Sequence, residues 1–167
     1  MNDLEAQAIQ DEMMRYTEIS KDVEVNGSIA FTAQSPWIRN RTIRENIIYD
    51  QEFSASKYVD TIQFCELERD VGLQRMGDQT LIGDRGVTLS GGQKARLGLA
   101  RALYQDKELY LMDDPISALD AHVRSQIINN VYFGVLKDRT RILVTHAIDF
   151  LPKADHIVMM DKGRIIC

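Results

Sequence analysis

Short apolar runs alternate with longer stretches of mixed polar and apolar residues along the second half of this 167-residue chain. The apolar runs predict strands at residues 109–112, 142–145 and 157–160. The mixed stretches predict helices at 91–105 and 119–136. Strands that alternate with helices indicate an α/β fold with a mostly parallel sheet.

The first half has a different pattern. Residues 23–34 predict strands, with the dipeptide at 26–27, Asn-Gly, as a hairpin turn between them. Residues 38–80 predict helices, and Thr42 with Glu45 fits the capping-box pattern at the start of one of them. This order is consistent with one domain in two lobes.

The helix predicted at 91–105 begins in an unusual way. Ser90 and Gln93 fit a second capping box, and Gly91 with Gly92 would form the first turn without any covering side chain. Unpaired N–H groups and the positive end of the helix dipole would then face a ligand. An ordinary capped helix also fits Ser-x-x-Gln alone, but the glycine pair favours a phosphate site.

Four motifs carry a resemblance to the ATP-binding-cassette (ABC) superfamily over nearly the whole chain. Leu-Ser-Gly-Gly-Gln at 89–93 is similar to the family's signature motif. Residues 109–113 resemble a Walker B strand, and 114–120 resemble the D-loop that follows it. Gln34 and His146 stand where the family has its Q-loop glutamine and its switch histidine. The resemblance implies a P-loop NTPase-like fold, here a partial cassette over residues 1–167 with a helical subdomain at about 38–100.

The resemblance implies ATP and Mg²⁺ as cofactors. Gln34, Asp113 and His146 each lie at or just past the end of a predicted strand, where open parallel sheets bind ligands. Asp113 would ligate Mg²⁺, with Gln34 as a weaker neutral donor, and His146 would contact a terminal phosphate and orient the attacking water. The residues expected to face the nucleotide are Gln34, Ser90, Gly91, Gly92, Gln93 and Asp120, the last as an interface residue and not a metal ligand. Taken singly, each acid fits a strand-end cap and His146 fits a surface histidine.

Asp114 stands where active ABC sites usually have a glutamate that acts as general base. Aspartate is one methylene shorter, and a displacement of about 1 Å can lower a rate on the order of 100-fold. We therefore predict slow hydrolysis at any site built on Asp114. The Asp-Asp-Pro at 113–115 resembles the first nucleotide-binding domain of the C subfamily, the multidrug-resistance-associated exporters, whose first site is typically degenerate.

The sequence does not contain G-x-x-x-x-G-K-[ST], the P-loop that cradles nucleotide phosphates. We expect the chain to begin just after that loop. Residues 4–16 have apolar positions at near-helical spacing, which fits either the helix that follows a P-loop or an independent N-terminal helix. We expect weak ATP binding or none, and no ATP turnover, by this chain alone. Loss of the P-loop strand is also expected to leave apolar surface and sheet edges open.

Two functions compete. In the first, the chain is a fragment of the ATP-hydrolysing cassette of an ABC exporter at the cytoplasmic face of a membrane, coupling ATP binding and hydrolysis to transmembrane transport. Its partners would be a second nucleotide-binding domain, packed head to tail, and membrane-spanning domains contacted by Trp37 and Ile38. In the second, it is a non-catalytic module that supplies the signature motif in trans to a partner cassette, soluble and cytoplasmic if it is a genuine short protein. Exporter-like residues at 34–46 disfavour a role in translation or DNA maintenance.

Amino-acid composition excludes only a few classes of fold and function. With 44% hydrophobic and 27% charged residues, one domain with a sizeable core is expected. The formal net charge of −5 disfavours nucleic acid as a partner. Cys65 and Cys167 are too few for a disulfide framework or a metal site. No apolar run approaches the roughly 20 residues of a spanning helix, and the first residues lack a signal-peptide pattern.

Overall fold

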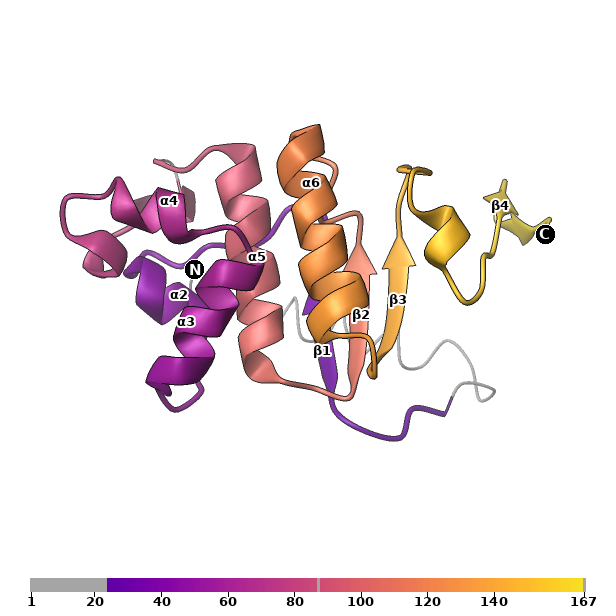
Figure 1. The fold of residues 1–167 in the computed structure, drawn as a ribbon, viewed down its shortest axis with the longest axis horizontal. Helices are drawn as coiled ribbons and strands as arrows, with labels where there is room; N and C mark the ends of the chain where they lie inside the picture. Colours follow the sequence, from indigo (N-terminus) through magenta and orange to yellow (C-terminus); the bar gives the residue numbers. More distant parts are fainter. Residues whose placement is uncertain (1–23, 87, 167) are drawn as a thin grey trace.

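Three parallel strands form the central sheet of the structure, a computed structural model that describes residues 24–86 and 88–166 (Figure 1). The strands are β1 (Ile29–Thr32), β2 (Leu109–Asp113) and β3 (Thr140–Val144), in the order β1-β2-β3. Both pairings are parallel, with Phe31 beside Leu111 and Leu111 beside Ile142. The predicted α/β fold with a parallel sheet is therefore confirmed.

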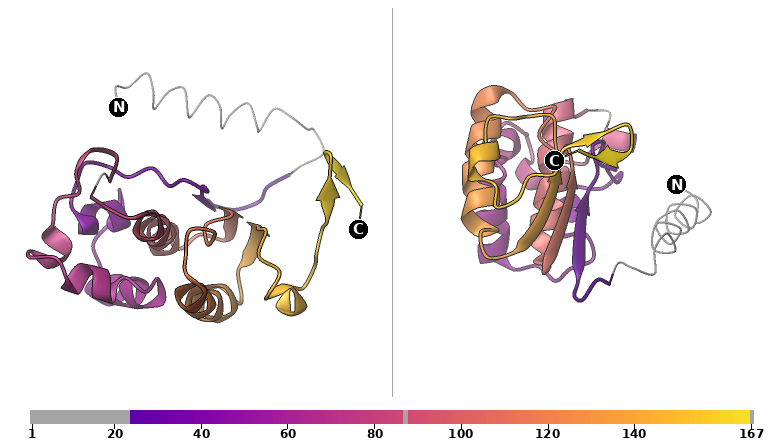
Figure 2. Two further views of the ribbon diagram at one scale, coloured as in Figure 1. Left: turned by 90° about the horizontal axis from the view of Figure 1, so that it is seen from above. Right: turned by 90° about the vertical axis from the view of Figure 1, so that its right-hand side faces the viewer.

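Helices lie at one end of the molecule and along the sheet. The helices are α2 (Ile43–Ile48), α3 (Ala55–Phe64), α4 (Glu68–Gly72), α5 (Gly91–Gln105) and α6 (Ala121–Ile127), which continues as the π-helix η3 (Ile128–Val135). Short 3₁₀ turns are η1 (Gly77–Gln79), η2 (Asp84–Gly86) and η4 (Leu151–Lys153). In Figures 1 and 2 the group α2, α3 and α4 lies beyond α5, at the end opposite the hairpin of β4 (Met160–Asp161) and β5 (Arg164–Ile165).

One face of the sheet forms the core. Ala30, Thr32, Tyr110 and Met112 alternate along β1 and β2 and are all buried. The apolar members of this set belong to the same cluster as the buried side chains of α5 and η3. Both crossovers therefore place their helices on the same face of the sheet.

The opposite face is apolar and exposed. Phe31 and Ile142 are 51% and 55% exposed, and Ile29 and Val144 are similarly open. Parallel sheets are normally covered on both faces. Within the described residues, β3 pairs with β2 alone, so its other edge is also open. The expectation of open apolar surface and an open sheet edge is therefore confirmed for this part of the chain.

Local capping signals are confirmed. Thr42 caps α2 with Glu45 as its reciprocal partner, and α5 begins at Gly91. Both boxes use a hydroxyl at the cap and a carboxylate or amide three residues later, so four residues determine each helix start.

Two expectations from sequence are wrong. No strand precedes β1 in the described residues, so Asn26 and Gly27 do not form the predicted hairpin turn. The backbone there is held by a contact distant in sequence, because the Ser28 N–H donates to the Glu108 carboxylate. Residues 157–160 are not a strand of the main sheet either, since only Met160 enters a strand, paired with Ile165 in a small hairpin.

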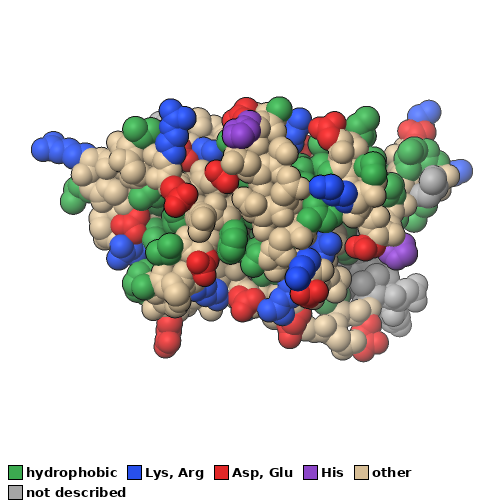
Figure 3. Space-filling view, in the orientation of Figure 1, with side chains coloured by type: hydrophobic (Ala, Val, Ile, Leu, Met, Phe, Trp, Pro, Cys, Tyr) green, Lys and Arg blue, Asp and Glu red, His purple; other side chains and the backbone are tan. Residues whose placement is uncertain are grey.

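Two further expectations concern single segments. Ile38 is buried in the core, at 3% exposed, which removes it as a contact for a membrane-spanning domain, whereas Trp37 is exposed. The helix predicted at 4–16 lies outside the described residues. Within the described part of the chain, no helix has the length and apolar character needed to cross a bilayer. Figure 3 shows acidic and basic side chains interspersed across one face of the molecule.

Candidate functional site

The N-terminus of α5 is closed by Ser90. Its hydroxyl accepts a hydrogen bond from the Gln93 N–H over 3.2 Å, and Gln93 Oε1 accepts one from the Ser90 N–H over 2.8 Å. The cap leaves the N–H groups of Gly91 and Gly92 in the first turn, where no intrahelical acceptor exists for them. Because α5 is 15 residues long, these amides stand at the positive end of a substantial helix dipole.

A hollow in the surface joins this helix N-terminus to the loop between β2 and α6. Its lining residues are Ser90, Gly91, Gly92, Arg96, Ala118, Leu119 and Asp120. A Cβ added to Gly92 would lie 3.1 Å from the Ala118 carbonyl oxygen, so a larger residue would push the two segments apart. Bare amides at a helix N-terminus are donors suited to an anion such as phosphate.

Asp120 also lines this hollow. Its carboxylate caps α6, with Oδ1 accepting hydrogen bonds from the N–H groups of Val123 over 3.0 Å and His122 over 3.1 Å. The bond from Val123, with that from His122, lowers the pKa of Asp120 below its usual value. Its place beside the signature residues fits the predicted interface role, and contact with a nucleotide stays a prediction.

Gln34, Asp113 and His146 lie at the carboxyl ends of the three strands of the sheet. Asp113 ends β2, while Gln34 and His146 each follow a strand end by two residues. The parallel register places these strand ends side by side, and all three residues are exposed. The topology thus brings the three strand ends together at the carboxyl end of the sheet, and the role of these residues as one site stays a prediction.

A magnesium site at this edge stays a prediction. No group of three His, Cys, Asp or Glu side chains is arranged to hold a metal ion in the residues that the structure describes. Asp113 and Gln34 offer only oxygen donors. That fits Mg²⁺, which is commonly held by one or two carboxylates and completes its shell with water and phosphate oxygens.

Asp114 differs from Asp113 in its surroundings. Its φ of 43° turns the chain sharply, and its N–H donates to the Val144 carbonyl over 2.8 Å. The side chain is buried and accepts a hydrogen bond from the Thr145 hydroxyl over 3.2 Å. The Asp114 side chain is therefore largely buried, and one of its carboxylate oxygens is bound to Thr145.

Three side chains that support the site were not found from sequence: Asp70, Arg96 and Arg101. Each forms bonds with residues from a different element, and no local spacing rule indicates such partners. Arg101, on α5, donates to the Asn46 carbonyl over 2.8 Å, to Asn46 Oδ1 over 3.0 Å and to the Trp37 carbonyl over 2.7 Å. Burial lowers the pKa of Arg101 to about 10, so it remains a cation at neutral pH. It ties α5 to the segment that follows Gln34.

Replacing Arg101 with Met is expected to lower the free energy of unfolding by about 3 kcal/mol, because hydrogen bonds from a charged donor are worth roughly 1.5–3 kcal/mol each. The Asn46 carbonyl lies in the last turn of α2, where helical carbonyls lack intrahelical donors. Urea denaturation of the chain measures the change. The exposed Arg75, replaced by Met, is the control, and equal effects at the two positions would contradict this account.

The sequence of the chain is similar to those of known proteins. The family model described as "ABC transporter" matches residues 4–117 of this chain. The chain is 47% identical over 149 residues to ABC transporter C family member 5 of Arabidopsis thaliana, covering 89% of the chain and 10% of that relative. It is 48% identical over 147 residues to ABC transporter C family member 8 of Dictyostelium discoideum, covering 86% of the chain and 9% of the relative. It is 47% identical over 146 residues to ATP-binding cassette sub-family C member 2 of Mus musculus, covering 86% and 10%. The chain thus spans about a tenth of the length of these relatives.

Proposed function

Because this chain belongs to the ABC transporter family, we propose that it is part of the ATP-binding cassette of a C-family exporter and completes the ATP site of a second cassette packed head to tail. The observation that carries the proposal is the N-terminus of α5, where Ser90, Gly91 and Gly92 line a hollow beside Ala118. Bare amides in this position suit a phosphate held by another domain. Similarity to C-family members over most of the chain supports the exporter class.

Each residue group has its own role in this proposal. Gly91 and Gly92 bind the terminal phosphates through their N–H groups, and the Ser90 hydroxyl adds a further polar contact. Asp113 and Gln34 would hold Mg²⁺, which supplies charge neutralisation at the phosphates. His146 orients the attacking water from the next strand end. ATP binding and hydrolysis would supply the free energy for transmembrane transport, through contacts with membrane-spanning domains.

The site built on Asp114 is proposed to have low turnover. A general base must come within hydrogen-bond reach of its water. The Asp114 side chain is largely buried, one of its carboxylate oxygens accepts a hydrogen bond from Thr145, and it is one methylene shorter than glutamate. Both features support slow hydrolysis at this position.

Replacing Asp114 with Glu, in a protein that carries this chain together with a P-loop, is expected to raise ATP turnover by about tenfold or more, because a longer side chain brings its carboxylate nearer the water. Release of inorganic phosphate measures the rate. Asp60, exposed on α3 and replaced by Glu in the same way, is the matched control. Unchanged turnover at Asp114→Glu would overturn the low-turnover proposal.

The alternative is a non-catalytic module that supplies the signature face in trans. An antibody against this chain, applied to native extract, distinguishes the two through the mass of the endogenous protein. A band far above 19.1 kDa in the membrane fraction supports the exporter cassette. A band at that mass outside the membrane fraction would contradict it and leave the trans-acting module as the function.

A further inference from the structure

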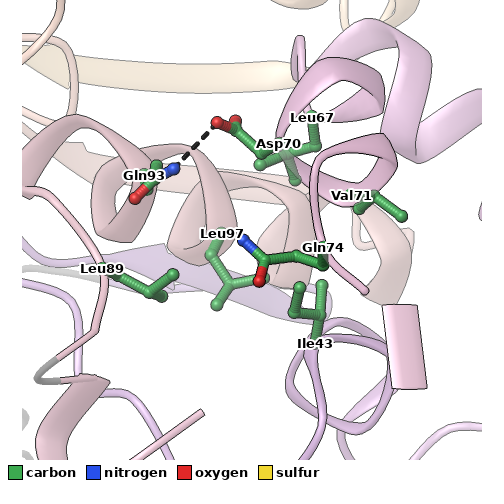
Figure 4. Close-up of a pocket in the computed structure, with 8 residues that line it drawn as sticks. All are labelled: Ile43, Leu67, Asp70, Val71, Gln74, Leu89, Gln93 and Leu97. Atoms are coloured by element: carbon green, nitrogen blue, oxygen red, sulfur yellow. Dashed lines mark hydrogen bonds between the residues drawn. The ribbon is translucent and has the colours of Figure 1, made fainter. Parts of the chain in front are cut away.

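Gln93 connects the signature loop, residues 89–93, to the helical region. Its Oε1 accepts the Ser90 N–H over 2.8 Å, which is half of the capping box. Its Nε2 donates to Asp70 Oδ1 on α4 over 2.9 Å, as Figure 4 shows. Both ends of one amide are therefore used, and the orientation of the side chain is determined by its two partners.

Asp70 holds α5 at a second point. The Arg96 guanidinium lies 2.7 Å from Asp70 Oδ2, and the two side chains are 14% and 18% exposed. Gln93 and Arg96 are three residues apart on α5, so they lie on one face of that helix. A single carboxylate of α4 therefore contacts two positions in the first two turns of α5, one by a hydrogen bond and one by an ion pair.

Apolar packing surrounds these polar contacts. Figure 4 shows a small cavity beside Asp70 and Gln93, whose apolar lining residues are Ile43, Leu67, Val71, Leu89 and Leu97. These apolar side chains offer Gln93 no hydrogen-bond partner, and Asp70 is the side chain that accepts from its amide nitrogen.

We infer that Asp70 is a positioning residue for the signature loop: it orients Gln93, which fixes the Ser90 N–H and keeps the Gly91 and Gly92 amides directed into the hollow beside Ala118. Displacement of α4 relative to α5 is then transmitted to the phosphate-facing amides. The inference rests on the proposed function for its consequence, since these are the amides proposed to serve a partner's ATP. The link itself rests only on the hydrogen bonds and the packing.

Two substitutions test the link by breaking and then reversing it. Gln93→Glu keeps an acceptor for the Ser90 N–H but removes the donor to Asp70 and brings two carboxylates together. Adding Asp70→Asn restores the contact between positions 70 and 93 with donor and acceptor exchanged. The amide nitrogen introduced at position 70 can donate to the carboxylate introduced at position 93, while the amide oxygen at position 70 stays beside Arg96.

Amide hydrogen exchange in the 167-residue chain measures how firmly the signature loop is held. For Gln93→Glu we expect the Ser90 and Gln93 amides, which are the donors of the capping box, to exchange about tenfold faster or more, in line with the loss of one charge-assisted hydrogen bond. For the double variant we expect exchange within about twofold of the original chain, since the reversed bond is of the same class. Gln63→Glu, at an exposed position of α3, controls for the added charge. Amides of β2 report global opening and are expected to stay unchanged.

The inference would be overturned if Gln93→Glu left the exchange rates of the loop amides unchanged. It would also be overturned if adding Asp70→Asn failed to restore those rates. A second arm measures ATP-dependent association with a cassette that carries a P-loop. The single variant is expected to lose association and the double variant to regain it. If the original chain shows no association, the proposed function fails, while the exchange data still decide whether Asp70 positions the loop.

Discussion

Gly91→Asp is expected to weaken ATP-dependent association with a P-loop-bearing cassette by about 100-fold or more, because two like charges about 4 Å apart repel by roughly 4 kcal/mol near a protein surface. Gly91 is the first residue of α5 and lines the hollow. A carboxylate at this position would stand where the account places a partner's phosphate.

The same substitution is expected to stabilise the chain. A Cβ on Gly91 would lie 3.8 Å from the Ala118 Cβ, an ordinary contact. An acidic side chain in the first helical turn adds about 0.3–1 kcal/mol through the helix dipole. Binding and stability should therefore change in opposite directions, which separates a loss of function from misfolding.

Gly91→Asn is the matched control, since it has nearly the same shape without the charge. Association measured by analytical ultracentrifugation with ATP, and stability measured by urea denaturation, complete the test. Equal association by the Asp and Asn variants would show that no anion approaches this turn.

Gly98→Ala is expected to lower the free energy of unfolding by about 2 kcal/mol, the range of overpacking in a close-packed interior. A Cβ at Gly98 would lie 2.6 Å from Pro36 Cβ and 2.7 Å from Pro36 Cγ, closer than such atoms can approach. The gain of about 1 kcal/mol in helix propensity from Gly to Ala does not offset this contact. Gly98 thus sets the distance between α5 and the segment that follows Gln34.

Gly72→Ala is the control for this prediction. Gly72 ends α4, and no atom lies within 4 Å of an added Cβ there. Only the propensity change acts at this position, so its stability should stay the same or rise. If both alanine variants respond alike in urea denaturation, the close approach of Gly98 and Pro36 does not constrain the fold.

The elements that could be predicted from sequence depend on local rules. Ser90 and Gln93 are three residues apart and fix the start of α5, as Thr42 and Glu45 do for α2. The strand ends at Gln34, Asp113 and His146 could be grouped because parallel strands place their carboxyl ends at one edge.

The contacts that could not be predicted join distant segments. Asp70 bonds to Gln93 across 23 residues, and Arg101 bonds to Asn46 across 55. No spacing pattern indicates such pairs, because they depend on how α4, α2 and α5 pack. The hairpin expected at Asn26 failed for the same reason: a tertiary contact outweighed a local turn preference.

The most direct test of the central claim places a label on the terminal phosphate itself. A P-loop-bearing cassette is loaded with an ATP analogue whose terminal phosphate carries a photoreactive group, mixed with this chain and illuminated. The account predicts that mass spectrometry finds the label within residues 88–94 of this chain and that Gly91→Asp abolishes it. Labelling confined to the partner, or found elsewhere on this chain, would contradict the claim that the N-terminus of α5 faces a partner's nucleotide.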